Sequence, residues 1–115
     1  MRECAITQES HGHYDVLRLH GSLDSFSFPK LEKALNELRE GRRNQVILDC
    51  VGLNYISSVA IGALIGFARR ARENQGDLKL ANLSPKIQNI IELLGFQRIL
   101  EVHARLEDAA AKFKN

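Results

Sequence analysis

Apolar residues along this chain recur with two different periods, which together predict a succession of short strands and helices. Two short apolar runs at 4–8 and 14–20 flank the turn-rich residues 10–13, a pattern typical of two strands that pair as a hairpin. After Gly21 the spacing changes to the i, i+3, i+4, i+7 repeat of a helix face, and Gly41 stands where a C-terminal cap belongs. The residues on this face are Leu31, Ala34, Leu35 and Leu38.

The second half of the chain repeats the alternation of strand and helix. Residues 45–50 (QVILDC) form a continuous apolar run, as expected of a central strand covered on both faces. A helix is marked most clearly by Ser84 as N-cap and Pro85 at the first helical position, with Gly95 beyond its end. The other expected elements are a helix over 58–74, a strand over 78–83, a strand over 99–102 and a final helix over 106–113.

This order of elements predicts one α/β domain that spans residues 1–115, with four helices. Three successive strand–helix–strand units imply right-handed crossovers, and hence a mostly parallel sheet with an antiparallel first strand. In such sheets functional loops gather at the carboxyl ends of the strands. That rule directs attention to residues 21–25 and 49–58.

Composition narrows the function classes. The chain has 115 residues, a net charge of only +2 and no stripe of Lys and Arg, so we expect no nucleic-acid partner. The N-terminus has no apolar signal segment, and the longest nearly apolar run, 55–68, is too short to cross a bilayer. We therefore expect a cytoplasmic protein without direct membrane insertion.

Metal and cofactor sites are not indicated either. Cys4 and Cys50 each lie in an apolar stretch with no second ligand at metal-binding spacing, as expected of buried thiols in a reducing compartment. The one close histidine pair, His11 and His13, falls in the predicted hairpin turn, where a solvated role is expected. These residues therefore predict no metal and no cofactor.

Two hydroxyl side chains at the start of the helix over 58–74 are the main chemical feature. Ser57 is expected to be the N-cap, and Ser58 would then occupy the first helical position. At that position unpaired amides and the positive end of the helix dipole favour an anion, so a phosphate on Ser58 would be accommodated. The alternative is that both serines serve only the structure of the helix start.

The segment 46–65, together with GSLD at 21–24 and NLSP at 82–85, resembles the STAS domain of bacterial anti-sigma factor antagonists, and the resemblance covers nearly the whole chain. It implies that a partner kinase, which is also the anti-sigma factor, phosphorylates Ser58, with Ser57 as the second choice. Two departures from the usual family pattern are Ser57, where many members have Asp, and the pair Val59 and Ala60, where a small residue and a Gly usually follow.

The resemblance also implies a switch loop and its partner. Asp24 matches an aspartate that would act electrostatically near the phosphoacceptor, although a cap of the adjacent turn is an equal alternative. The expected binding residues are Asp24, Asn54, Ser57, Ser58 and Val59. Unphosphorylated, the chain would bind an anti-sigma factor with serine kinase activity, and phosphorylation would release it. A STAS subunit that docks on a membrane transporter ATPase is the alternative, and the oligomeric state stays open.

Three further expectations concern individual residues. An enzyme that uses Ser58 as nucleophile is disfavoured, because the sequence has no Gly-x-Ser-x-Gly elbow and places no His near the serines. Asp49 and Asn54 are expected to hydrogen-bond backbone amides before the serines. Gly62 and Gly66 are expected to allow close packing of their helix against a neighbouring element.

Overall fold

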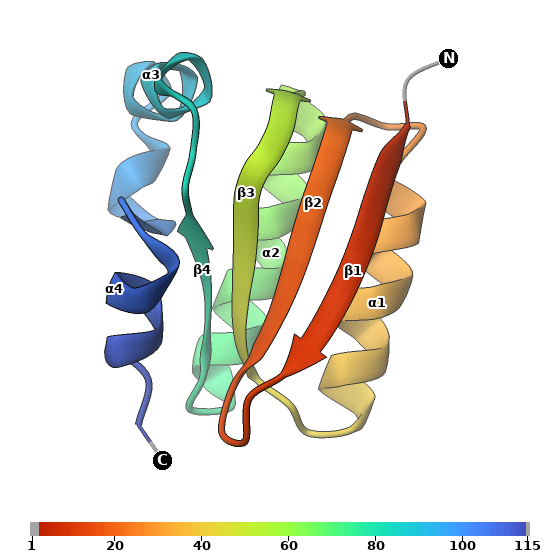
Figure 1. Cartoon of the computed structure of the whole chain (residues 1–115), viewed down its shortest axis with the longest axis vertical. Coiled ribbons are helices and arrows are strands. Elements are labelled where there is room, and N and C mark those ends of the chain that lie inside the picture. The colour runs from red at the N-terminus through yellow and green to blue at the C-terminus, as the bar shows by residue number, and fades with distance from the viewer. Residues whose placement is uncertain (1–2, 115) are drawn as a thin grey trace.

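The computed structural model describes residues 3–114, which form a five-stranded sheet with four α-helices. Figure 1 shows strands side by side, with α1 (Phe28–Glu40) and α2 (Ser58–Glu73) behind the sheet. The strands are β1 (Cys4–Ser10), β2 (Asp15–Leu23), β3 (Gln45–Ile56), β4 (Asp77–Ala81) and β5 (Glu101–His103). The helices are α1 (Phe28–Glu40), α2 (Ser58–Glu73), α3 (Pro85–Leu93) and α4 (Leu106–Ala111), with a short 3-10 helix at Phe96–Arg98.

The strands lie in sequence order, β1-β2-β3-β4-β5. β1 pairs antiparallel with β2, and every later pair is parallel, which confirms the predicted α/β class. Because each crossover is right-handed and each strand is added on the same side of the last, the crossover helices cover one face of the sheet. α4 follows the last strand and packs on the opposite face of the sheet, where Ala109 joins Val16, Ile47 and Ala81.

Two hydrophobic clusters hold these layers together. The larger one lies between the sheet and α1, α2 and α3, and side chains such as Leu17, Leu48 and Leu64 in it are almost completely buried. The smaller one lies beneath α4 and contains Val16, Ile47, Ala81, Ala109 and Phe113. The alternate residues of β2 and β3 therefore face different clusters, as the twofold period of a strand requires.

Several predicted strand boundaries were wrong. β3 continues to Ile56 rather than ending at residue 50, and β2 continues to Leu23 rather than residue 20. Register shifts between the two strands absorb the irregular stretch, so that pairing persists beyond Gly52. Much of the expected loop 49–58 is thus strand. β4 ends at Ala81 and β5 begins at Glu101, with the 3-10 helix before β5 not anticipated.

Two glycine positions show opposite constraints. Gly21 has φ +109°, and a Cβ there would lie 2.2 Å from the carbonyl oxygen of Glu3, so only glycine fits. The expectation of close packing at Gly62 and Gly66 was wrong, because a Cβ at either position would meet nothing within 4 Å. Gly62 and Gly66 follow Ser58 at intervals of four residues, so all three lie along one side of α2.

Candidate functional site

The site is built where β2 and β3 end and α1 and α2 begin, at the carboxyl edge of the sheet. The amide of Ser57 donates to the carbonyl oxygen of Leu23 at 2.9 Å. The hydroxyl of Ser22 donates to Oδ1 of Asn54 at 3.0 Å. These two bonds join the segment before α1 to the segment before α2, so the two predicted functional regions form one surface.

Ser57 caps α2 as predicted. Its backbone is extended, and its Oγ accepts a hydrogen bond from the amide of Ala60 at 3.1 Å, while its carbonyl oxygen accepts from Ile61 at 3.0 Å. The capping bond occupies the Ser57 hydroxyl and satisfies one of the amides that a helix start leaves unpaired.

Ser58 is the first residue of α2 and is exposed. Among residues 3–114, neither its hydroxyl nor the amides of Ser58 and Val59 have a hydrogen-bond partner. The next side chain, Val59, is 68% exposed, whereas Ala60 is fully buried. A free hydroxyl, two unpaired amides and the positive end of a 16-residue helix therefore meet at one accessible point.

Asp24 organises the turn that leads into α1. Its Oδ1 accepts from the amides of Phe26 at 2.9 Å and of Ser27 at 3.1 Å. The hydroxyl of Ser27 in turn accepts from the amide of Asp24 at 3.0 Å and donates to the carbonyl oxygen of Ser22 at 2.7 Å. The capping role expected as one alternative for Asp24 is thus present in the structure.

Sequence reasoning missed two residues of this turn. Ser27 is buried and ties the turn to the end of β2, and Phe26 is 88% exposed beside it. The pattern Asp24-Ser25-Phe26-Ser27 is rich in turn-forming residues and could have indicated Ser27, because Asp and Ser side chains bond to nearby backbone groups. The exposure of Phe26 depends on the path of the loop and has no such signal.

Asp49 lies away from the serines. It is buried on the face of the sheet opposite α2, where it forms an ion pair with Arg18 at 3.2 Å and accepts from Asn82 at 3.0 Å. It does accept one backbone amide, from Val51 at 3.2 Å, but this bond lies within β3. The expected bond to a backbone amide is therefore confirmed for Asp49, although it lies within a strand and not in a loop. Asn54 bonds to the Ser22 hydroxyl instead.

The two thiols are buried and free, as the sequence indicated. Burial raises the pKa of the Cys50 thiol well above its ordinary value, and the nearby Asp49 raises it further. Burial also raises the pKa of Cys4. Neither thiol is poised as a nucleophile, because the thiolate is the reactive form.

Within residues 3–114, no group of three or more His, Cys, Asp or Glu side chains could hold a metal ion. No helix in the same range is long and apolar enough to cross a membrane.

Comparisons with known proteins identify the family. The model of the STAS domain matches residues 5–109. The chain is 34% identical over 96 residues to BtrV of Bordetella bronchiseptica, which is provisionally assigned as an anti-sigma factor antagonist; the match covers 84% of this chain and 83% of BtrV.

Solved structures agree in fold. An anti-sigma factor antagonist from Mycobacterium paratuberculosis superposes with a TM-score of 0.84 at 19% identity, covering 94% of this chain and 92% of that one. The Bacillus anti-sigma factor antagonist SpoIIAA has been solved unphosphorylated (TM-score 0.73, 22% identity, 93% and 94% covered) and phosphorylated (0.72, 21%, 96% and 100%). At these identities the likeness concerns the fold alone.

Proposed function

The chain belongs to the STAS domain family, and from that premise we propose that it acts as an anti-sigma factor antagonist switched by phosphorylation of Ser58. The observation that carries the proposal is the exposed Ser58 hydroxyl at the start of α2, beside two unpaired amides. The names given to BtrV and to the Mycobacterium paratuberculosis protein supply the functional class. SpoIIAA, which has this fold, has been solved in both phosphorylation states.

The unphosphorylated surface suits close contact with a partner. Val59 offers an exposed apolar side chain, and Gly62 and Gly66 continue the same side of α2 without side-chain bulk. Small and apolar groups lose little hydration when a partner covers them, which is the composition found at the centre of protein interfaces. The partner in this proposal is an anti-sigma factor with serine kinase activity.

Phosphorylation would reverse this preference through charge. A phosphate on Ser58 adds about −1.5 to −2 units of charge at pH 7, and the Ser58 and Val59 amides can hold it without refolding of α2. Inside the interface the phosphate would lose its hydration, and no cation would be placed to compensate its charge. Partner binding would therefore become unfavourable. The antagonist would therefore keep its fold and lose its partner.

Asp24 and Asn54 frame the acceptor from the neighbouring segments. Asp24 follows Leu23, whose carbonyl oxygen accepts from Ser57, and Asn54 accepts from Ser22. The proposal assigns Asp24 both the turn cap and an electrostatic contribution near Ser58. In this proposal the protein is a kinase substrate in the cytoplasm and not an enzyme.

The test is phosphosite mapping together with partner binding. The untagged chain is isolated from its native cell with whatever remains bound, incubated with ATP, and analysed by mass spectrometry. We expect phosphate on Ser58 and an ATP-dependent release of the bound kinase. Phosphate restricted to Ser57, or co-purification of a transporter ATPase with no modification of either serine, would contradict the proposed switch.

A further inference from the structure

The outer edge of β1 is open for backbone hydrogen bonding. β1 is the terminal strand of the sheet, and Figure 1 shows no strand beyond it. The carbonyl oxygen of Glu3 accepts from Ser22 at 2.9 Å, and the amide of His11 donates to Tyr14 at 2.8 Å, so the residues just outside both ends of β1 face β2. Since successive residues of a strand point to opposite edges, the residues that direct their N–H and C=O groups away from the sheet are Cys4, Ile6, Gln8 and Ser10.

This edge lacks the devices that natural proteins use to block strand addition. β1 has the sequence CAITQES, with no Pro and no Lys, and it pairs with β2 in continuous register without a bulge. Its one charged residue, Glu9, already forms an ion pair with Arg18 and a hydrogen bond with His11 of the same molecule. An extended segment could therefore pair with β1, because no Pro, Lys or bulge in β1 blocks it.

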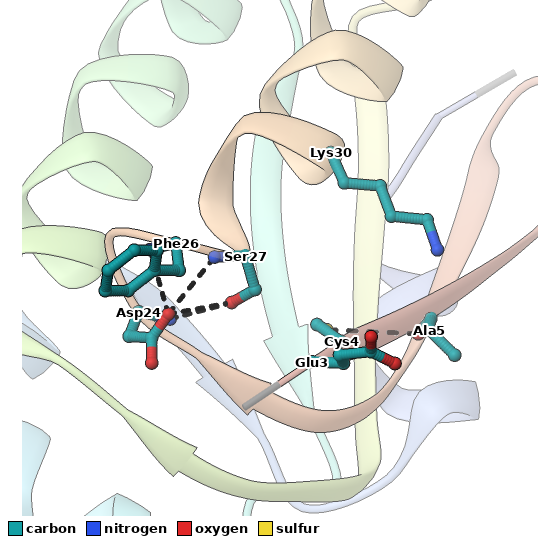
Figure 2. Close-up of a pocket in the computed structure, with 7 residues that line it drawn as sticks. All are labelled: Glu3, Cys4, Ala5, Asp24, Phe26, Ser27 and Lys30. Atoms are coloured by element: carbon teal, nitrogen blue, oxygen red, sulfur yellow. Dashed lines mark hydrogen bonds between the residues drawn. The ribbon is translucent and has the colours of Figure 1, made fainter. Parts of the chain in front are cut away.

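A hollow of about 840 Å³ lies beside the first half of this edge, between β1 and the start of α1. Figure 2 shows its lining: Cys4 and Ala5 from β1, Phe26 from the turn, and Lys30 from α1, whose side chain extends across toward Ala5. Phe26 is 88% exposed and stands at the wall of the hollow. A large apolar side chain on an added strand would find an apolar surface here.

The charge of Lys30 favours an acidic side chain on a segment that adds to β1. Lys30 forms no ion pair with any residue in 3–114, and its ammonium lies close enough to lower the pKa of Cys4, although burial, the larger influence, raises it. Two carboxylates also line the hollow, but Asp24 already accepts the amides of Phe26 and Ser27, and Glu3 is exposed to solvent. A carboxylate on the occupant would give Lys30 an ion pair in a partly enclosed place.

We infer that β1 and this hollow bind an extended segment of another protein, which adds as a sixth strand and carries a large apolar side chain with an acidic one two residues away. The backbone bonds hold the segment to the outward groups of Cys4, Ile6 and Gln8, as in other cases of strand addition. Residues two apart on a strand share a face, so both selected side chains enter the hollow between β1 and α1. The hollow shares Asp24 with the segment that neighbours Ser58, but Ser58 does not line it. Binding of the segment does not require phosphorylation.

The probe is a capped heptapeptide, acetyl-Thr-Glu-Thr-Phe-Thr-Glu-Thr-amide, which presents Phe with an acid on either side in both strand directions. Titration into the isotope-labelled 115-residue chain, followed by NMR, should shift the amide signals of β1 and of Phe26 and Lys30. The shifts should saturate and yield a Kd. The Phe→Ala peptide should bind at least about tenfold more weakly, since most of the buried apolar area is lost. No shift at β1, or equal binding of the Phe→Ala peptide, overturns the inference.

Two protein variants separate strand addition from non-specific adhesion. Gln8→Pro removes an outward N–H while leaving the bonds to β2 intact, so it should weaken the peptide about tenfold, whereas Gln8→Ala should not. Lys30→Glu should reverse the charge preference, so that the peptide with Lys in place of both Glu residues becomes the better ligand. Unaltered preference in Lys30→Glu contradicts the assigned role of the ammonium.

Size-exclusion chromatography with light scattering tests whether a second copy of the chain is the occupant. We expect a monomer at the titration concentration. A dimer that Gln8→Pro dissociates would mean that β1 pairs with itself, and it would overturn the inference. The peptide titrations and the chromatography use only the unphosphorylated protein. Their results therefore do not depend on whether Ser58 is phosphorylated.

Discussion

The amide of Ser57 donates to the carbonyl oxygen of Leu23 at 2.9 Å, and this bond fixes the start of α2 to the end of β2. Asp24 follows Leu23 directly, and Ser58 follows Ser57. The turn that caps α1 and the proposed phosphoacceptor are consequently parts of one rigid edge of the sheet. For a substitution in either segment, the effect on the free energy of unfolding and the effect on partner binding can be measured separately.

Ser57→Ala should lower the free energy of unfolding by about 1 kcal/mol, because the amide of Ala60 loses its acceptor. Urea denaturation monitored by circular dichroism measures the change. Ser84→Ala is the matched control: it removes the equivalent cap of α3, where Ser84 Oγ accepts from Ile87 at 3.2 Å, at a place remote in sequence from the proposed site. Both variants should lose similar stability, but only Ser57→Ala alters a residue of the proposed partner surface. An unchanged unfolding energy in Ser57→Ala would mean that the cap has no energetic role.

Gly62→Ala should raise the free energy of unfolding by roughly 0.5–1 kcal/mol, since alanine restricts the unfolded chain and favours a helix interior. A Cβ at this position meets no atom within 4 Å, so no repulsion offsets the gain. Gly21→Ala is the contrasting control, because its Cβ would overlap the Glu3 carbonyl, and it should destabilise strongly. Thermal melts distinguish the two. A lower stability of Gly62→Ala would contradict the open space around Gly62 on this side of α2.

The sequence predicted the fold because each element carried its own local signal. The caps Ser57 and Ser84 and the apolar stripes of the helices specify where helices start and which face is buried, and these features depend only on nearby residues. The ends of β2 and β3 were misjudged because pairing across register shifts at Gly21 and Gly52 is a property of two strands together. No local pattern encodes such a shift.

The site was predictable in part for the same reason. Ser57 and Ser58 stand at a helix start, and that start is visible in the sequence. Asp49 was expected in the same loop, but the parity of β3 directs it to the opposite face, where Arg18 pairs with it. The hollow beside β1 could not be predicted, because it forms between residues 3–5 and 24–30, which meet only through the packing of α1 against the sheet.

Glu101→Gln should destabilise the protein at neutral pH by about 1 kcal/mol and have little effect in acid. Partial burial raises the pKa of Glu101, but hydrogen bonds from the buried Lys79 and from His103 outweigh it and leave the pKa below its ordinary value. A lowered folded-state pKa gives stability that is present above about pH 4.3, the unfolded value, and is lost as pH falls through the folded pKa. Urea denaturation of both proteins across this range measures the difference. Glu92→Gln, an exposed change on α3, should show no such pH dependence.

Asp24→Asn separates the cap from the charge. Asn retains an Oδ1 acceptor for the amides of Phe26 and Ser27, so thermal stability should change little, while Asp24→Ala should cost about 1 kcal/mol. If the carboxylate also acts electrostatically near Ser58, Asp24→Asn should slow phosphorylation by the cognate kinase. The initial rate of phosphate incorporation measures this effect. A normal rate in Asp24→Asn would leave Asp24 with the capping role alone.

The two serines should respond to substitution in different ways, because only the Ser57 hydroxyl is engaged in a hydrogen bond within residues 3–114. Ser58→Ala should fold with unchanged stability, resist phosphorylation and bind the partner constitutively. Ser58→Glu should also fold normally, since a negative charge is favourable at a helix start, yet it should weaken partner binding by placing that charge in the interface. Ser57→Ala should be less stable but still accept phosphate on Ser58.

Phosphosite mapping and pull-downs with the co-purified kinase, run on all three variants, measure these outcomes. Unchanged partner binding by Ser58→Glu would place the switch elsewhere on the molecule, and phosphate lost from Ser57→Ala but retained by Ser58→Ala would move it to Ser57.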